Sequence, residues 1–483
     1  MNINQFRNLV SERLFYYFQE ICRIPRGSGN MKGMREYLEQ FALHHELPYY
    51  SDAADNVIIY VGASKGYEEK PIVILQGHMD MVCEKTEGYD HDFFKDPIVL
   101  QVEDGVLSAK GTTLGGDDGV AVAAMLAIAE NDEIPHPALE LVFTSDEEIG
   151  MLGASLLDMS RLDGRIMINL DNEAEHEILC GCAGGICVNM LLPLSYQEMQ
   201  ADWLEVEIKG LKGGHSGTEI DKIHANSNVL AGRLLYNLDN EIEFALAEMS
   251  GGTKDNAIPR FTKMLIGISS DDKQTFMDVI ARVEKELQKE YHGSDEAICI
   301  VASEMGEQVQ PALSPSSLQK VILYLRNIPN GIYKMSGINP GLVETSSNLG
   351  ILQLLPNGLS STVGVRSNLS SGKQDLVERL VSFSEFLGAR TNLSGAYAEW
   401  EFRKESALRE QMVRIYRRHY GKEPVVAVMH AGVECSIFVD ALPGLDCVSF
   451  GPDIFDIHTT EEHMPVDSVD RFYAYLLAVL ADF

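Results

Sequence analysis

The chain has 483 residues, of which 45% are hydrophobic and 23% are charged, and its formal net charge is −33. This length exceeds what one hydrophobic core usually supports, so we expect at least two domains. The strong negative charge argues against a nucleic-acid-binding function, because phosphate contacts require clustered Lys and Arg.

No apolar run is long enough to span a bilayer, which argues against a membrane protein. The first residues, Met1 to Arg7, lack the basic start and apolar middle of a secretory signal peptide, so we expect a cytoplasmic protein. The eight cysteines are scattered and include no Cys-x-x-Cys pair. This argues against a disulfide scaffold. Cys180 and Cys182 could bind a metal, but buried free thiols are the favoured interpretation of this pair.

The first part of the chain alternates predicted helices and strands. Helical periodicity covers residues 3–21, 31–47 and 120–129, and short apolar runs predict strands at 56–61, 71–75, 139–144 and 165–170. From about residue 186 the pattern changes to mixed strands and helices, with helices expected at 224–238, 272–289, 315–327 and 372–387. The strands expected there are 186–193, 202–209, 261–268, 296–304, 343–355 and 359–366. The first pattern then returns, with helices at 406–419, 433–439 and 467–481 and strands at 424–429 and 445–450.

These patterns predict an α/β fold. We expect a discontinuous catalytic domain with a mainly parallel sheet covered by helices, made of residues 1–185 and 396–483. Residues 186–395 are expected to form an inserted α+β lid domain, composed of two related halves.

Polar residues follow the predicted strands where each strand ends. His78 and Asp80 follow the strand at 71–75, Glu147 and Glu148 follow the next, and Asp171 the third. His458 follows the last strand, and Asp117 lies in a glycine-rich turn before a helix. Ligands bind at the carboxyl ends of strands in open α/β sheets, so these side chains are expected to form one site.

Each of these signals is weak alone. His78 could be a satisfied buried histidine, and the Glu pair a solvated turn. Together, three carboxylates and two imidazoles suit two divalent cations, with zinc as the first choice and cobalt or manganese as substitutes. Asp80 could then orient His78, and Glu147, if Glu148 is a ligand, could act as general base on a metal-activated water.

The segments 77–82, 115–119 and 146–150, with a late His458, resemble the dizinc aminoacylase/carboxypeptidase-type peptidases. Within them the chain is most similar to the aminoacyl-histidine dipeptidases, which cleave Xaa-His dipeptides including carnosine. The resemblance runs from about residue 5 to the end of the chain. It implies that His78 and Asp171 bind one zinc ion and that Glu148 and His458 bind the other. It also implies that Asp117 binds both ions. It also implies a cis peptide bond between Asp117 and Asp118, where many relatives have Asn at the second position.

The segment from Gly210 to Gly217 resembles the lid motif of this family. The resemblance implies that His215 reaches the substrate carbonyl. The alternative of a phosphate-binding loop does not fit, because the glycines of this segment do not have the spacing of such a loop. By the same resemblance Asn256 belongs to the lid, Arg366 binds the substrate's free carboxylate, and Glu434 borders the substrate pocket. For Arg366, a surface salt bridge is an equal alternative. We expect the two domains to hinge near residues 185 and 396.

The expected function is hydrolysis of a small peptide, a dipeptide and in particular Xaa-His. A same-mechanism amidohydrolase acting on other dipeptides, tripeptides or N-acyl amino acids stays open. So does a non-catalytic binding protein that kept the fold. The sequence does not give the number of subunits, and a homodimer stays open.

Overall fold

The computed structural model describes residues 6–483, which form two compact units. Unit 1 comprises the chain up to Gly181 together with Phe402–Val428 and Val433–Phe483. Unit 2 comprises Cys182–Glu401 and the short segment Met429–Gly432. The domain boundaries expected from sequence, after residues 185 and 395, lie within six residues of these. The assignment of residues 429–432 to unit 2 was not anticipated.

Unit 1 is built on an eight-stranded sheet whose four central strands, β6, β3, β7 and β21, run parallel. In spatial order the strands are β1 Tyr49–Ser51, β2 Val57–Val61, β6 Leu139–Thr144, β3 Val73–His78, β7 Ile166–Asn169, β21 Asp446–Ser449, β8 Glu177–Cys182 and β20 Val425–Met429. Every residue of β3 and β6 is buried, as expected for strands covered on both faces. The pairings of β1 with β2, β2 with β6 and β21 with β8 are antiparallel, which the alternating pattern of the sequence did not reveal.

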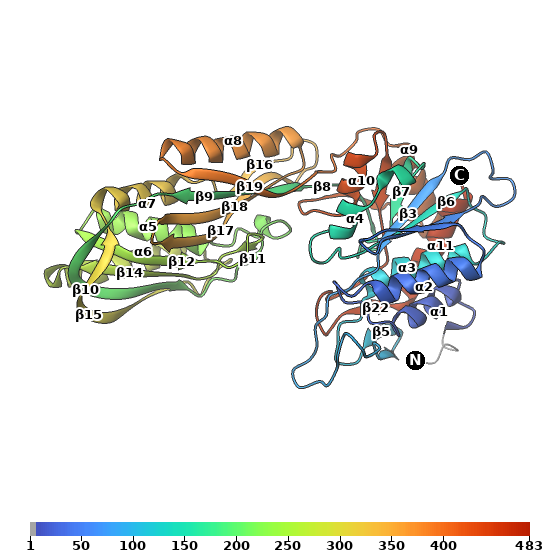
Figure 1. Ribbon diagram of the computed structural model, residues 1–483, viewed down its shortest axis with the longest axis horizontal. Coiled ribbons are helices and arrows are strands. Elements are labelled where there is room, and N and C mark those ends of the chain that lie inside the picture. The colour runs from blue at the N-terminus through green and yellow to red at the C-terminus, as the bar shows by residue number, and fades with distance from the viewer. Residues whose placement is uncertain (1–5) are drawn as a thin grey trace. The chain divides into compact units, whose positions relative to one another are not determined.

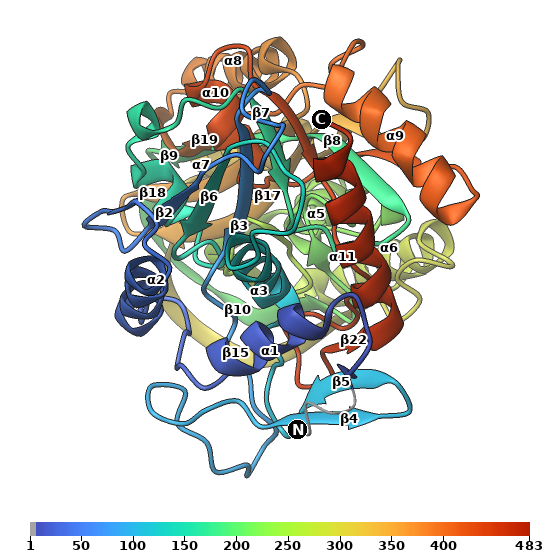
Figure 2. The ribbon, with the colours of Figure 1, turned by 90° about the vertical axis from the view of Figure 1, so that its right-hand side faces the viewer.

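Helices cover both faces of this sheet. They are α1 Glu12–Ile21, α2 Lys32–His44, α3 Gly116–Ala129, α4 Leu152–Leu156, α9 Ala407–Tyr420, α10 Cys435–Ala441 and α11 Val466–Ala481. Figure 1 shows α3 and α11 on one face of the sheet and α4 and α10 on the other. Figure 2 shows α3 next to α1, directly above it in this view, and every residue of α3 is buried. A helix that is apolar on all sides is a core helix, and α3 is the centre of the unit 1 core. A small sheet of β4 Leu100–Glu103, β5 Val106–Ala109 and β22 His463–Pro465 completes the unit.

The first helix is shorter than predicted. Residues 3–5 of the predicted helix 3–21 lie outside the described residues, and α1 begins only at Glu12. The prediction was wrong for the preceding turn because Asn8 has a φ of 74°, a left-handed conformation that an α-helix cannot contain.

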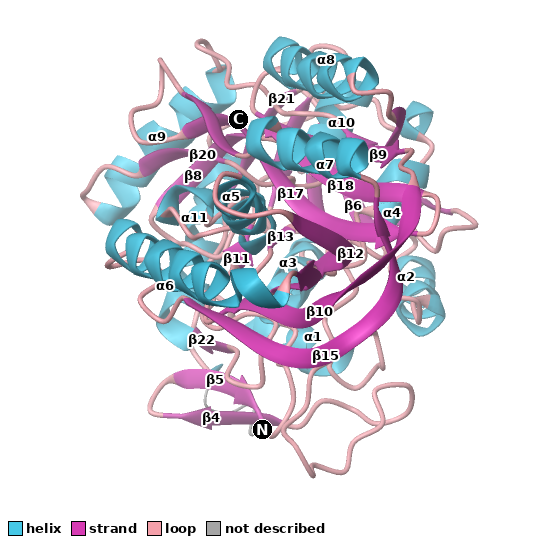
Figure 3. Ribbon diagram, turned by 90° about the vertical axis from the view of Figure 1, so that its left-hand side faces the viewer, coloured by secondary structure: helices cyan, strands magenta, loops and turns pink. Residues whose placement is uncertain are grey.

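Unit 2 is a nine-stranded sheet with helices. Its strands, in spatial order, are β15 Cys299–Leu313, β10 Tyr196–Lys209, β14 Thr262–Ile268, β12 Phe244–Gly251, β17 Val343–Leu355, β18 Gly358–Ser367, β9 Gly184–Leu192 and β19 Arg390–Tyr397, and β16 Gly331–Met335 pairs with β17. The helices are α5 Ser227–Asp239, α6 Lys273–Glu290, α7 Pro315–Asn327 and α8 Ser370–Phe386, and a separate pair joins β11 Gly214–His215 to β13 Ala257–Ile258. Figure 3 shows the long curved strands β10 and β15 at one edge. The two predicted halves therefore share one continuous sheet.

No helix among residues 6–483 combines the length and the hydropathy needed to cross a bilayer.

Candidate active site

His78, the last residue of β3, is the centre of a buried polar cluster in unit 1. Its Nε2 lies 3.0 Å from Asp117 Oδ1 and 3.5 Å from Asp171 Oδ1. Its Nδ1 lies 3.3 Å from Asp80 Oδ1. A carboxylate on one ring nitrogen leaves the other nitrogen free to bind a cation, which is how histidine ligands are usually oriented.

Asp117 also reaches a second histidine. Its Oδ2 lies 3.2 Å from His458 Nε2, and the same nitrogen lies 3.0 Å from Glu148 Oε2. The ligand atoms of Asp117, Glu148 and His458 all lie within 4.8 Å of one another. One carboxylate therefore lies between two imidazoles, each with a further carboxylate, which is the arrangement needed to hold two neighbouring cations.

Asp80 links these groups to the end of β6. Its carboxylate accepts hydrogen bonds from the backbone N–H groups of Glu147 (3.0 Å) and Glu148 (3.2 Å) and from Ser28 Oγ (2.7 Å). The Glu pair is therefore held by its backbone, which leaves the Glu148 carboxylate to contact His458 and the Glu147 carboxylate to face the cluster. His78, Glu147 and Glu148 place one donor atom each within 4.8 Å of one another.

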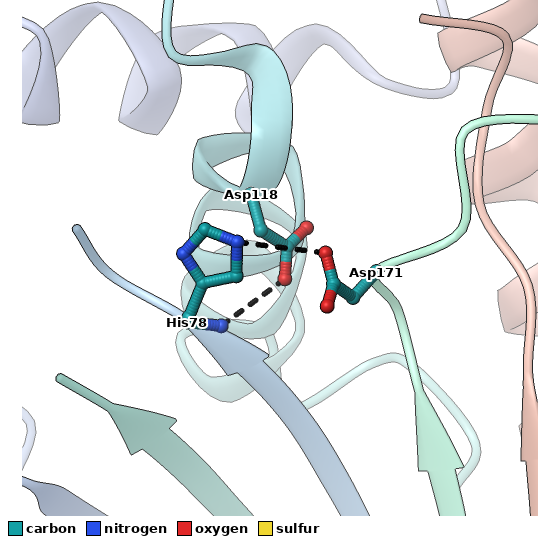
Figure 4. Close-up of side chains that lie close together, drawn as sticks. All are labelled: His78, Asp118 and Asp171. Carbon is teal, nitrogen blue, oxygen red and sulfur yellow. Dashed lines mark hydrogen bonds and ion pairs between the residues drawn. The ribbon is translucent and has the colours of Figure 1, made fainter. Parts of the chain in front are cut away.

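The turn before α3 brings Asp117 and Asp118 to the cluster. The peptide bond between them is cis, which confirms the prediction. Asp118 Oδ2 accepts a hydrogen bond from the backbone N–H of His78 (3.2 Å), as Figure 4 shows together with the approach of Asp171 to the ring. A Cβ at Gly77 would collide with the Asp118 carboxylate, so β3 can pass this close only with glycine there.

The cluster carries more buried negative charge than its own cationic groups balance. Burial raises the pKa of Asp171 to about 6 and that of Glu173 to about 8, and neighbouring carboxylates add to both shifts. Burial likewise raises the pKa of Glu147 well above its usual range. Hydrogen bonds to Asp117 and Glu148 raise the pKa of His458 to about 10. Carboxylates that are this costly to ionise fit a site completed by divalent cations, and oxygen and imidazole donors suit zinc.

Two residues that the sequence analysis missed hold the ligand-bearing turns. The buried Glu462 carboxylate accepts hydrogen bonds from the backbone N–H groups of Leu114 (2.8 Å), Gly115 (3.0 Å) and Gly116 (2.7 Å). The buried Arg26 donates to the carbonyl oxygens of Met79 (3.2 Å), Asp80 (3.0 Å) and Gly115. Both act on backbone groups far away in sequence, so no local pattern marks them.

Substituting Glu462 with alanine is expected to lower the free energy of unfolding by about 2–5 kcal/mol, because buried N–H donors lose their acceptor. The neighbouring Glu461 is exposed, so Glu461→Ala should change stability by less than about 0.5 kcal/mol. Urea unfolding of both variants measures the difference. Equal stabilities would show that the Glu462 contacts contribute nothing.

Glu434 lies inside unit 1 and is fully buried. Its Oε2 accepts hydrogen bonds from Gln76 Nε2 (2.6 Å) and Thr144 Oγ1 (2.7 Å), and burial raises its pKa to about 8. These contacts attach it to β3 and β6, the strands that carry His78 and the Glu pair. They favour a supporting role, and substrate binding by Glu434 stays a prediction.

His215 and Arg366 lie together in unit 2. His215 Nε2 is 3.5 Å from Arg366 Nη2, and Arg366 Nη1 donates to the Tyr397 hydroxyl (2.6 Å). His215 Nδ1 accepts from the backbone N–H of Thr218 (3.1 Å), which favours the tautomer with the ring proton on Nε2. Burial and the Arg366 charge lower the pKa of His215, which keeps it a neutral donor. The pair offers N–H groups suited to an anion.

Asn256 is exposed, and its backbone carbonyl accepts from the Ser216 N–H (2.9 Å) beside the pairing of β11 with β13.

His430 belongs to the segment that returns to unit 2. Its ring lies between Ser346 Oγ (2.8 Å) and Asn368 Oδ1 (3.1 Å), and burial lowers its pKa to about 3. The carbonyl of Met429 also accepts from Asn368 Nδ2 (2.8 Å), so side-chain and backbone contacts together hold residues 429–432 to unit 2.

Comparison with known families defines the class of this protein. Residues 74–482 match the model of peptidase family M20/M25/M40, so the chain belongs to this family and is a peptide-bond hydrolase. The chain is 33% identical to the cytosol non-specific dipeptidase of Escherichia coli over 482 residues, 99% of each chain.

Solved structures of two peptidases have the same fold as this chain. The fold matches aminoacylhistidine dipeptidase from Vibrio alginolyticus with a TM-score of 0.89 and 33% identity, covering 100% of this chain and 98% of that one. Aminopeptidase PepT from Bacillus cereus shares the fold at 16% identity, with a TM-score of 0.56 over 98% and 99% of the two chains. The resemblance to aminoacyl-histidine dipeptidases is confirmed, as is the α/β fold with an additional α+β unit.

Proposed function

We propose that this protein is a two-zinc dipeptidase whose substrates include Xaa-His dipeptides. The observation that carries the proposal is the position of Asp117, with one oxygen 3.0 Å from His78 and the other 3.2 Å from His458. His78 and Asp171 would hold one ion, Glu148 and His458 the second, and Asp117 both. Cobalt or manganese could replace zinc.

When bound, two such ions polarise a carbonyl and lower the pKa of water towards about 7. Glu147 then acts as the general base. It takes one proton from the attacking water as the new carbon–oxygen bond forms at the scissile carbonyl. It passes this proton to the leaving amine nitrogen as the carbon–nitrogen bond breaks, which yields two free amino acids. Asp80 keeps the His78 ring in place and holds Glu147 by its backbone N–H.

The residues of unit 2 have different roles in this proposal. His215 Nε2–H donates to the oxygen that becomes negative during attack. Arg366 pairs with the free carboxylate of the substrate, and Asn256 belongs to the same substrate-binding set. Glu434 supports the strands beneath the metal ligands. The relative from Escherichia coli is named a cytosol dipeptidase, which supports a cytoplasmic location for this protein.

The test combines metal analysis with a substrate panel. Protein loaded with zinc should contain about two ions per chain and should hydrolyse dipeptides, Xaa-His among them. Full activity with one ion would contradict the dinuclear site. Turnover restricted to tripeptides or N-acyl amino acids would favour the related amidohydrolase, and no turnover of any substrate would favour a binding protein.

Arg366→Ala is expected to raise KM for free-acid dipeptides by about 10²-fold, since a charged hydrogen-bonded pair contributes roughly 1.5–3 kcal/mol. Dipeptide amides lack the carboxylate, so their kcat/KM should change little. The control is Arg379→Ala on α8, where the side chain is exposed. An equal loss on acids and amides would make Arg366 structural.

A further inference from the structure

A cavity of about 580 Å³ lies in unit 1 beside the candidate metal ligands. Apolar side chains form most of its wall: Met81, Val82, Phe93, Phe94 and Ile149. This volume lies in the range of roughly 300–1,000 Å³ typical of small-molecule pockets. None of the roles described above uses it.

The cavity shares residues with the catalytic cluster. Glu148, whose Oε2 lies 3.0 Å from His458 Nε2, is one of its lining residues. Ser28 is another, and its hydroxyl donates to Asp80 Oδ2 (2.7 Å). Met81 directly follows Asp80 in the chain. A molecule bound at the ions therefore has this cavity as its immediate neighbour within unit 1.

The loop that forms part of the wall, residues 84–97, is held by hydrogen bonds within the loop and to Gly111. The Thr86 N–H donates to the Gly111 carbonyl (3.0 Å). Lys85 Nζ donates to the His91 carbonyl (2.8 Å), and Asp92 accepts from the Phe94 N–H (3.0 Å). The wall is thus preorganised, which reduces the entropic cost of binding.

The chemistry of the wall suits an uncharged apolar group. Phe94 is 72% exposed and Ile149 is 55% exposed, so two large apolar side chains face water at a site next to the chemistry. Each charged lining residue has a polar partner. Lys85 is directed to a carbonyl, and the Asp92 carboxylate is paired with Lys95 (2.6 Å). The third, Glu148, contacts His458 and is a proposed metal ligand, so the lining has no Asp, Glu, Lys or Arg left to bind a charged side chain.

We propose that this cavity receives the side chain of the N-terminal residue of the dipeptide and favours large apolar residues there. The assignment rests on the proposed function. In that function Arg366 of unit 2 takes the C-terminal carboxylate and the ions take the scissile carbonyl. The residue before the scissile bond is then the one that meets the unit 1 wall next to Glu148.

The test compares kcat/KM for two mirrored series on zinc-loaded full-length protein. One series varies the N-terminal residue (Ala-Ala, Leu-Ala, Phe-Ala, Lys-Ala), and the other varies the C-terminal residue (Ala-Leu, Ala-Phe). Wild type should favour Phe-Ala over Ala-Ala by roughly 10- to 200-fold. Phe94→Ala should lower kcat/KM for Phe-Ala about 10-fold and leave Ala-Ala within about twofold.

Phe94→Glu provides a second, directional readout, because it places a carboxylate in the wall. This variant should lower kcat/KM for Phe-Ala further and raise kcat/KM for Lys-Ala above the wild-type value. A folding defect cannot produce such a gain. The matched control is Phe386→Ala on α8, where the phenylalanine is 86% exposed in unit 2, and it should leave every substrate unchanged.

The outcomes separate this assignment from the function on which it rests. An equal loss on Phe-Ala and Ala-Ala in Phe94→Ala, or a loss confined to the C-terminal series, would overturn the cavity assignment while dipeptidase activity stands. Absence of dipeptide turnover by the wild type would refute the proposed function and this assignment with it.

Discussion

Replacing Glu147 with glutamine is expected to lower kcat for dipeptide hydrolysis by about 10²- to 10⁴-fold, the range typical of a lost general base. The amide has nearly the same shape but cannot accept a proton from water. Its backbone N–H still donates to Asp80, and none of the proposed ligands changes, so the variant should keep about two ions per chain. Metal analysis and steady-state kinetics on the same sample measure both properties.

Glu133→Gln is the matched control, because Glu133 is exposed in the turn after α3. It should have wild-type kinetics. A Glu147→Gln variant that turns over near the wild-type rate would mean that another group accepts the proton. A variant that loses its ions as well would make Glu147 a ligand.

Asp117→Ala is expected to have the second large effect, loss of both ions and of detectable turnover. Asp117 is the only residue among the proposed ligands assigned to both ions, and its two oxygens lie 3.0 and 3.2 Å from the two histidines. Losing a shared carboxylate also removes the negative charge that lets two divalent cations lie side by side. Metal content after dialysis, compared with that of wild type, gives the result.

His458→Ala provides the contrast, because it should lose one ion and retain the other. Asp163→Ala, at an exposed position before β7, should retain both. If Asp117→Ala retained two ions, the bridging role would be excluded, and Asp118, which also lies within reach of His78 and Asp171, would be the residue to test next.

The elements best predicted from sequence were those whose composition reflects burial on all sides. The runs at 71–75 and 139–144 are mainly apolar, and they correspond to the fully buried central strands β3 and β6. Strands β19 and β16 were missed because most of their residues are exposed, so neither strand shows a buried apolar run in the sequence. Such strands are fixed by pairing with a neighbour and not by their own composition.

The same distinction applies to the site. His78, Asp117, Glu148, Asp171 and His458 lie together as expected, since the ends of parallel strands meet at one edge of a sheet. Arg26 and Glu462 could not be found this way. Their partners are backbone groups of distant turns, and a backbone group has no signature in the sequence. The return of residues 429–432 to unit 2 was also not predicted, because the side chains that contact the His430 ring, Ser346 and Asn368, are distant in sequence.

The strand order of unit 1 has a consequence for how the chain is made. β21, residues 446–449, pairs with β7 in the middle of the sheet, and Glu462 holds the turn of Asp117 from a position still later in the chain. Residues 182–401 of unit 2 are continuous and leave the ribosome before either of these. Domains generally fold as units during synthesis, so the inserted unit can fold first. The N-terminal strands of unit 1 cannot complete their sheet until β21 has been made. A nascent chain that ends before residue 446 therefore lacks a complete sheet and also His458, one of the proposed metal ligands, so we expect cations to bind the site only after this last part of the chain has been made.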